Sequence, residues 1–174
     1  LDNNLAVLPT ETVYGLAANA LSTNAVKKVY DLKGRPSQNP LIVHVLDYSW
    51  VDKIAVSNHL FFKLADRFWP GPLTLILQSK AIIPKITTGG LNTVALRSPN
   101  CEPFRKCLDQ TQLYLAAPSA NLSNRISPTC ARHVISNFGS KTPPIFDGGA
   151  ARYGIESTVL DISSEKIQLL RHGP

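Results

Sequence analysis

Two cations separated by one glycine, Lys33 and Arg35, are the residues whose types and spacing point most directly to chemistry. Pro36 disfavours the helical region for the residue before it, so we expect Arg35 to be extended. In an extended segment the side chains at positions i and i+2 lie on the same side, and both cations can then face one anion. Gly34 lets the backbone approach a ligand closely. A guanidinium fork beside a compact ammonium suits a polyphosphate, although two cations in a loop also fit a solvated surface.

Other polar residues stand near the ends of expected strands, in places also two positions apart. They are Ser119 and Asn121, Arg97, Ser157 and Arg171, with Thr10 and Thr12 in an early hydroxyl-rich loop. Because ligands of open α/β sheets gather at strand ends, this pattern predicts a binding site there. For each residue taken singly, turn chemistry, backbone capping or an exposed charge remains the simpler interpretation.

The common signatures of nucleotide-binding and hydrolase chemistry are absent from the sequence. It contains no G-x-x-x-x-G-K-[ST] loop, no G-x-G-x-x-G turn and no G-x-S-x-G elbow. Ser119 has no histidine or acid close to it in sequence, so we do not expect a serine nucleophile. The three cysteines form no C-x-x-C pair and the four histidines lack H-E-x-x-H spacing. We therefore expect no metal site built from side chains and a reducing, cytoplasmic location.

The composition is that of an ordinary globular protein, 44% hydrophobic and 17% charged, and the 174 residues fit one domain over 1–174. The formal net charge of +6 favours an anionic partner, but the cations form no run that would make a basic tail. No apolar run approaches the roughly 18 residues of a membrane helix, and residues 1–5 do not resemble a secretory signal, so no membrane partner is expected. Because the chain has no Met, we expect that some N-terminal residues are missing.

The hydrophobic patterns predict an α/β fold with a mixed sheet. Strands are expected over residues 5–8, 41–46, 73–77, 93–98, 113–117, 144–146, 157–162 and 166–171, the last two as a closing hairpin. Helices are expected from Ser22 or Thr23 to Lys33, over 57–68 and 102–109, and after a cap at Ser127 with Pro128 in the first position. Residues 9–16 are expected to form a loop.

Segments spread over almost the whole chain, in order, resemble the YrdC-like family of L-threonylcarbamoyladenylate synthases. The matching segments are Pro9–Leu16, Lys33–Pro36, Asn39–Leu41 with His44, Trp69–Thr74, Ala95–Pro99, Ala117–Asn121, Asp147–Gly149, Glu156–Val159 and Leu169–Arg171. The joint occurrence of the K-x-R and S-x-N motifs with the first segment is highly specific.

The resemblance implies a twisted mixed sheet wrapped around a deep, positively charged cavity. It also implies a reaction in which L-threonine, bicarbonate or CO2, and ATP give threonylcarbamoyl-AMP and pyrophosphate, with Mg2+ held largely by the phosphates. Other proteins would then transfer the threonylcarbamoyl group in the N6-threonylcarbamoyladenosine (t6A) modification of tRNA. Direct tRNA binding by this chain is compatible with that scheme but not required by it.

By the same resemblance, one set of residues would hold the nucleotide and another the amino acid. ATP would be bound by Lys33, Arg35, Arg97, Pro118, Ser119, Asn121 and Arg171, with Lys33 and Arg35 as the catalytic residues. Threonine would be surrounded by Thr12, Arg35, His44 and Ser157. Without the resemblance, His44 in its apolar strand would be interpreted as a core histidine. Adenylyl transfer needs positioning and charge neutralisation rather than a covalent nucleophile, so a chain without a catalytic triad can still be an enzyme.

The chain departs from the family after Arg171, where His-Gly-Pro replaces the Pro-Gly that the family commonly has. An upstream helix common in the family and the C-terminal domain of its long forms are not in this sequence. Two other functions remain open. One is an RNA-binding module that uses the basic cavity, although no Lys/Arg stripe or aromatic platform is present. The other is a carbamoyltransferase domain that handles carbamoyladenylate, although the hydrogenase-maturing type carries zinc-finger cysteine pairs that are missing here.

Overall fold

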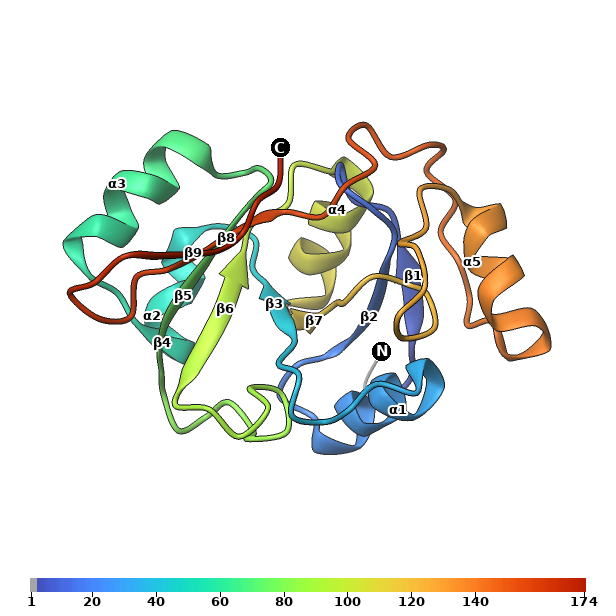
Figure 1. Cartoon of the computed structure of the whole chain (residues 1–174), viewed down its shortest axis with the longest axis horizontal. Coiled ribbons are helices and arrows are strands. Elements are labelled where there is room, and N and C mark those ends of the chain that lie inside the picture. The colour runs from blue at the N-terminus through green and yellow to red at the C-terminus, as the bar shows by residue number, and fades with distance from the viewer. Residues whose placement is uncertain (1–2) are drawn as a thin grey trace.

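A mixed nine-stranded sheet runs through the computed structural model, which describes residues 3–174 (Figure 1). Its strands are β1 (Ala6–Leu8), β2 (Gly15–Asn19), β3 (Ile42–His44), β4 (Ala55–Val56), β5 (Leu73–Ser79), β6 (Thr93–Arg97), β7 (Leu115–Ala116), β8 (Thr158–Asp161) and β9 (Gln168–Arg171). Eight of them follow the order β1-β2-β7-β3-β6-β5-β8-β9, and β4 pairs with β5 outside that path. The pairs β3–β6 and β5–β8 are parallel and the rest antiparallel. The predicted α/β class with a mixed sheet is confirmed.

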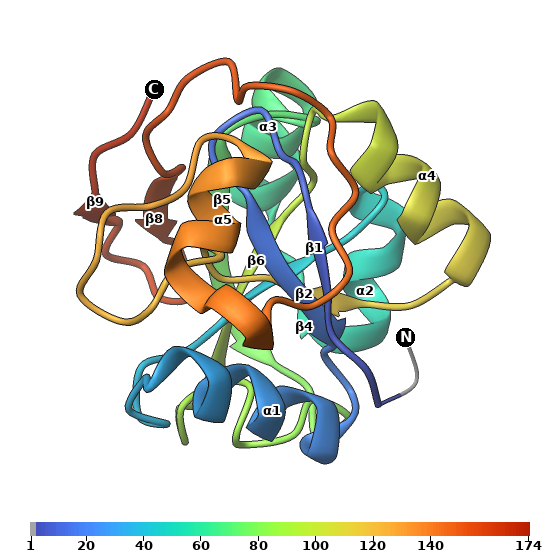
Figure 2. The same ribbon diagram turned by 90° about the vertical axis from the view of Figure 1, so that its right-hand side faces the viewer.

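Helices flank this sheet at its two ends and behind its middle strands (Figure 1). They are α1 (Thr23–Lys33), α2 (Val51–Ile54), α3 (His59–Phe68), α4 (Glu102–Thr111) and α5 (Ala131–Phe138), with short 3-10 turns at Tyr48–Trp50 and Gly139–Lys141. Figure 1 shows α2 and α3 beside β5, and Figure 2 shows α1 and α5 next to each other at the opposite end, near β1 and β2. Among residues 3–174, no helix has the length and apolar character that crossing a membrane requires.

The two faces of the central strands do different work. Successive residues of a strand point to opposite faces. Leu75 of β5 and Leu96 of β6 are fully buried in one hydrophobic cluster with Phe61 of α3. Their neighbours in the sequence, Ile76 and Ala95, line a cavity instead. The sheet therefore separates the main core from the surface on which a site can form.

Helix α1 ends at the K-x-R motif and sets its geometry. The Ser22 hydroxyl caps the helix by accepting the Ala25 amide, and Lys33 is the last helical residue. Gly34 then adopts the left-handed conformation (φ 59°, ψ 36°), which closes the helix and suits glycine best. The expectation that Lys33 and Arg35 share one extended segment was therefore wrong. The proline that follows restricts Arg35 only, and it does not prevent the helix from continuing to Lys33.

Most of the other predicted elements are confirmed to within a few residues. The strands expected at 41–46, 73–77 and 93–98 are β3, β5 and β6, and the closing hairpin is the antiparallel pair β8–β9. The helices expected over 57–68 and 102–109 are α3 and α4. These segments carry strong hydrophobic periodicity, which is the most dependable signal in a sequence.

Weaker signals gave wrong or incomplete predictions. Helix α5 begins at Ala131 with Cys130 as its N-cap, and the Ser127 hydroxyl donates to Glu156 Oε1 (2.9 Å) instead of capping a helix. The strand expected over 144–146 is a single bridge between Val7 and Ile145. Strand β2 was missed within and beyond the expected loop 9–16, because its small residues gain β structure from their pairing with β1 and β7.

Candidate functional site

A cavity of about 240 Å³ lies on the face of the sheet that turns away from the main core. Its floor is formed by alternate positions of two parallel strands, Ile42 and His44 of β3 and Ala95 and Arg97 of β6. His44 pairs with Arg97 in register. Alternate residues of a strand share a face, so these four side chains lie on one side of the sheet. The prediction that the polar residues gather at strand ends is confirmed, since His44 and Arg97 are the last residues of the parallel strands β3 and β6.

Eight of the ten residues predicted for the site line this cavity, and two stand behind its wall. The eight are Thr12, Arg35, His44, Arg97, Pro118, Ser119, Ser157 and Arg171. Lys33 and Asn121 are buried and do not line it. The cavity therefore collects side chains from the first segment of the chain to its last strand, as the resemblance implied.

Arg97 is the most deeply buried of the cations that line the cavity, with only 4% of its surface exposed. Its guanidinium donates to the Thr12 hydroxyl (2.9 Å) and to the Gly71 carbonyl (3.2 Å). Its Nη2 lies 2.7 Å from a carboxylate oxygen of Glu11. Burial lowers the pKa of Arg97 and the charge of Glu11 opposes that shift. Arg97 is thus fully engaged by the protein before any ligand binds.

Arg171 is held by two neighbouring residues on the other side of the cavity. It pairs with the Glu156 carboxylate and donates to the carbonyl (2.9 Å) and the hydroxyl (3.0 Å) of Ser157. The Ser157 hydroxyl also shares a hydrogen bond of 2.8 Å with Thr74. Burial raises the pKa of Glu156, but Arg171 and other donors outweigh it, so that the net shift is downward and Glu156 stays ionised.

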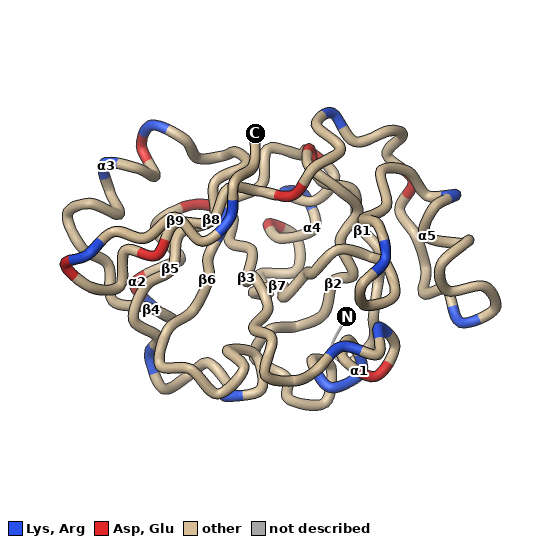
Figure 3. Tube along the Cα trace, in the orientation of Figure 1, with Lys and Arg blue, Asp and Glu red and all other residues tan. Residues whose placement is uncertain are grey.

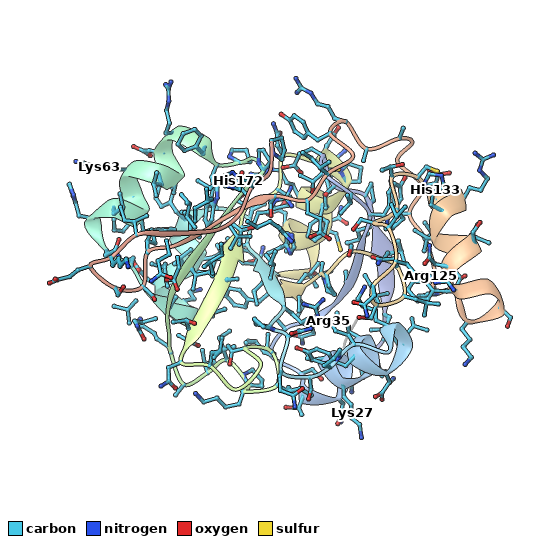
Figure 4. The ribbon with its side chains drawn as sticks, in the orientation of Figure 1. Lys27, Arg35, Lys63, Arg125, His133 and His172 are labelled. Atoms are coloured by element: carbon cyan, nitrogen blue, oxygen red, sulfur yellow. The ribbon has the colours of Figure 1, made fainter. Side chains whose placement is uncertain are left out.

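Arg35 is the least committed of the arginines that line the cavity. Figure 4 shows it just beyond the end of α1. It donates to the backbone carbonyls of Asn39 (3.3 Å) and Pro40 (3.1 Å), and it has no carboxylate partner within the described residues. Exchanging two carbonyls for a phosphate would replace neutral acceptors with a charged one, which makes a stronger hydrogen bond.

Lys33 acts as a clamp between α1 and the segment after β7. Its ammonium donates to the carbonyls of Ser119 (2.5 Å) and Asn121 (2.6 Å), and its own carbonyl accepts the Ser123 amide (2.8 Å). Burial first, and the nearby Arg35 charge second, lower the pKa of Lys33 to about 8. The positive charge of Lys33 therefore lies behind the wall that carries Ser119.

Asn121 stabilises the same segment from within. Its amide nitrogen donates to the carbonyls of Leu122 (2.8 Å) and Arg125 (2.7 Å). Its side-chain oxygen is buried and has no hydrogen-bond partner in the described part of the chain. In this geometry Asn121 shapes the wall beside Ser119, and its role as a direct ATP ligand stays a prediction.

His44 is a neutral hydrogen-bonding group on the cavity floor. Its Nδ1 lies 3.3 Å from the Leu115 carbonyl, which fixes the proton on Nδ1 because a carbonyl can only accept. The ring packs against Phe104, with centroids 4.9 Å apart. Burial first, and Arg97 second, lower the pKa of His44 to about 3. The imidazole thus offers Nε2 as an acceptor and does not serve as an acid near neutral pH.

The loop that carries Thr12 is rigid because one hydroxyl organises it. The Thr10 hydroxyl donates to the Val13 carbonyl (2.6 Å) and accepts the amides of Thr12 and Val13 (both 3.1 Å). Next to this loop, the buried Tyr14 hydroxyl donates to the Gly149 carbonyl (2.6 Å). These bonds fix the buried Thr12 in the wall of the cavity and tie its loop to the glycine-rich segment 147–149, which matches the family.

In the described part of the chain, the cavity has no metal site built from protein side chains alone. Within residues 3–174, no group of three or more His, Cys, Asp and Glu side chains could hold a metal ion. Of the described residues that line the cavity, only Glu156 has a carboxylate, and it is already bound to Arg171 and Ser127. The donor set therefore fits Mg2+ only as an ion held mainly by the ligand's own phosphates.

Two carboxylates of the site were missed at the level of sequence. Glu156 lines the cavity and Glu11 pairs with Arg97. Both lie inside segments that match the family, Glu156–Val159 and Pro9–Leu16, so the signal was available. The pattern that predicts a polyphosphate site consists of cations, and a carboxylate adds nothing to it.

The fold and the cavity define a class of protein: an α/β chain whose mixed sheet carries, on one face, a cationic pocket suited to a small anionic ligand. The family model Sua5/YciO/YrdC, which carries the description "Telomere recombination", matches residues 1–173, and the chain belongs to this family. The family predicted from the sequence motifs is confirmed.

Named relatives resemble the chain over nearly all of its residues. The threonylcarbamoyl-AMP synthase of Pyrococcus abyssi is 47% identical over 173 residues, which cover 99% of this chain and 51% of that protein. The enzyme of the same name from Bacillus subtilis is 47% identical over 175 residues, with coverage of 99% and 50%. The crystal structure of P. abyssi Sua5 complexed with L-threonine matches with a TM-score of 0.95 over 97% of this chain and 50% of that one. The chain thus spans about half the length of these relatives.

The buried lysine gives a pH-dependent prediction for stability. The pKa of Lys33 falls from 10.5 to about 8 on folding, so between these values the unfolded chain binds more protons than the folded one. Stability conferred by this group is therefore fully present above pH 10.5 and is lost as the pH falls through 8. Lys33→Met lacks this group. The unfolding free energy of the wild type, measured relative to that of Lys33→Met, should therefore rise by about 3 kcal/mol from pH 8 to pH 10.5.

Urea unfolding of both proteins across this pH range measures that difference. Lys63→Met removes an exposed lysine of α3 and serves as the control for loss of a positive charge. A difference for Lys33→Met that stays flat across the range would contradict the buried position of the ammonium.

Proposed function

We propose that this chain carries the threonylcarbamoyl-AMP synthase activity. The reaction joins L-threonine, bicarbonate or CO2, and ATP to give threonylcarbamoyl-AMP and pyrophosphate, for use by other proteins in the t6A modification of tRNA. The observation that carries the proposal is that Arg35, Arg97 and Arg171 line one cavity with Thr12 and His44. The identity of 47% to two threonylcarbamoyl-AMP synthases supports it, and favours it over a carbamoyltransferase domain.

Arginines would do the work of binding and neutralising the triphosphate. In the proposed reaction the amine of threonine takes up CO2, and an oxygen of the resulting carbamate attacks the α-phosphorus of ATP while pyrophosphate leaves. Negative charge then builds on the phosphate oxygens. Arg35 and Arg171 line the cavity with planar guanidinium groups that match pairs of phosphate oxygens. Such fixed donors stabilise the transition state without reorganising at the moment of reaction.

Lys33 would contribute by holding the wall of the site in place. Its two hydrogen bonds fix Ser119 and the following residues against α1. The hydroxyl of Ser119 then reaches the cavity from a defined position, while the ammonium adds positive potential from behind it. A direct bond from Lys33 to a phosphate would require the loss of at least one of these carbonyl bonds.

The threonine end of the site would be polar but weakly charged. His44 is neutral, and the charge of Arg97 is offset by Glu11. The Thr12 and Ser157 hydroxyls add donors and acceptors that suit a hydroxylated amino acid. Serine lacks one methyl group of threonine. A binding pocket discriminates between two such amino acids by about 1–3 kcal/mol, so we expect serine to be used more slowly.

Mg2+ is proposed as the companion of ATP and not as a resident ion. Glu156 is the only carboxylate among the described cavity residues, and Arg171 already neutralises it. When bound to the triphosphate, the ion would supply charge neutralisation to the departing pyrophosphate. The protein's own part in that neutralisation would fall mainly to Arg35, which has no carboxylate partner within the described residues.

Turnover by the purified chain tests the proposal. Incubation with ATP, Mg2+, bicarbonate and a panel of amino acids should release pyrophosphate only with threonine and, more slowly, serine. Arg35→Ala should lower kcat/KM by about 100-fold or more, since it removes a charged donor aimed into the cavity.

The control for this experiment is Lys63→Ala, which removes an exposed cation from α3, away from the cavity (Figure 4). Its kcat/KM should stay within about twofold of the wild type, as surface substitutions usually do. Threonine-independent pyrophosphate release, or full turnover by a folded Arg35→Ala protein, would refute the assignment.

A second candidate function, direct contact with RNA, is supported by how the charge is distributed. Residues 23–35 and 125–141 contain seven of the 18 Lys and Arg residues but only one of the 12 Asp and Glu residues. The rest of the chain is neutral, so these two segments account for the whole net charge of +6. They form α1, α5 and their flanking turns, which lie next to each other in Figures 2 and 3. We call these two neighbouring segments the basic face. Its exposed cations are Lys27, Lys28, Arg125, Arg132 and Lys141, and the partly buried Arg35 joins it to the cavity.

RNA affinity of the basic face should depend on salt through counterion release. Replacing Lys27, Lys28, Arg125 and Arg132 by Gln should weaken tRNA binding and reduce the slope of log K against log[salt] by about 0.7–0.9 per lost phosphate contact. Replacement of Lys53, Lys63, Arg67 and Lys80, all exposed elsewhere, is the matched control. If the two sets of substitutions weakened tRNA binding equally, the binding would reflect net charge alone, and the proposal that the basic face binds RNA would be refuted.

A further inference from the structure

Glu11 is a buried carboxylate that the proposed reaction does not use. Only 8% of its surface is exposed, and it does not line the cavity. Burying an ionised carboxylate is costly unless a partner compensates for the lost water. The burial of Glu11 therefore indicates that its carboxylate has a specific partner in the protein.

Its only polar contact within the described residues is Arg97. One carboxylate oxygen lies 2.7 Å from Nη2 of Arg97. Apart from that ion pair, neither oxygen has a hydrogen-bond partner in the part of the chain that the structure describes. The carboxylate thus serves one guanidinium and nothing else.

Backbone hydrogen bonds to residues 153 and 154 hold Glu11 in this position. Its carbonyl accepts the amide of Tyr153 (2.9 Å), and the next carbonyl, that of Thr12, accepts the amide of Gly154 (3.0 Å). The Thr10 hydroxyl fixes the turn that contains it. Glu11 therefore reaches Arg97 from a loop that several hydrogen bonds hold in place, and it does not line the cavity.

Arg97 is held on the cavity floor by three contacts with the protein. Glu11, the Gly71 carbonyl and the Thr12 hydroxyl each take one of its nitrogens. These three contacts fix the plane of the guanidinium, and the carboxylate also cancels its charge. Without the carboxylate, an uncompensated cation would remain in a region from which water is largely excluded.

We propose that Glu11 is the positioning residue for Arg97, which it orients and neutralises so that the floor of the cavity is polar without carrying net charge. This role rests on the proposed function, because it assigns Arg97 to the binding of the reactants. It predicts that Glu11 has no effect of its own once Arg97 has been removed.

A double-mutant cycle with Glu11→Gln, Arg97→Gln and the double variant tests this coupling. Each Gln substitution keeps most of the side-chain volume and removes one charge. Urea unfolding should show the double variant to be more stable than either single variant, because each single variant leaves one buried charge unpaired. A double variant less stable than both would overturn the proposal, and this result does not depend on any enzymatic activity.

Kinetics separate positioning from a merely structural role. Glu11→Gln should lower kcat for threonine-dependent pyrophosphate release by about tenfold or more, while KM for ATP stays equal or falls, because the freed charge of Arg97 attracts the polyanion. The kcat/KM of the double variant should match that of Arg97→Gln within about twofold. Two results would show that Glu11 acts independently of Arg97. One is a fall in the kcat/KM of the double variant equal to the product of the two single falls, and the other is a rise in KM for Glu11→Gln that matches its fall in kcat.

Binding of inorganic pyrophosphate, measured by calorimetry, tests the role of Glu11 independently of the proposed function. Glu11→Gln should bind pyrophosphate at least as tightly as the wild type, and weaker binding would count against neutralisation. Absence of threonine-dependent turnover in the wild type would refute the proposed function, while the unfolding cycle would still decide the role of Glu11. Glu102→Gln, which breaks an exposed pair with Lys106, is the control and should change none of these readouts.

Discussion

Mutual repulsion among four cations around one partly buried cavity is the constraint on which the rest of this structure depends. Each cation has its own compensation within the protein. Arg97 is paired with Glu11, and Arg171 is paired with Glu156. Lys33 and Arg35 are bound by backbone carbonyls, which carry no full charge. The potential that remains for a ligand is therefore concentrated near the two groups that lack a carboxylate.

The sheet makes this arrangement possible because its two faces are independent. Leu75 and Leu96 supply the hydrophobic core on one side, while Ala95 and Arg97 on the other side can be polar or small without weakening it. Parallel pairing of β3 with β6 then places His44 beside Arg97 from distant parts of the chain. Alternate positions of the same strands thus serve stability and binding. The side chains on the cavity floor can be substituted without changing those of the hydrophobic core.

Much of the fold and part of the site could be predicted from the sequence. Strongly periodic strands and helices such as β5 and α3 were found, whereas β2 was not, because its small residues owe their pairing to neighbours that are distant in sequence. The resemblance of the motifs identified eight of the residues that line the cavity. The extended conformation predicted for Lys33 was wrong, because the sequence does not show that Gly34 adopts a left-handed conformation that ends helix α1. The burial of Glu11 and the gathering of scattered cations on one face arise from tertiary structure alone.

A crystal structure of the chain with a non-hydrolysable ATP analogue and L-threonine tests the central claim most directly. The account predicts the triphosphate on the guanidinium groups of Arg35 and Arg171, the amino acid between Thr12, His44 and Ser157, and the Glu11–Arg97 pair unchanged beneath them. Nucleotide bound outside this cavity, with Arg35 and Arg171 still on their present partners, would contradict it.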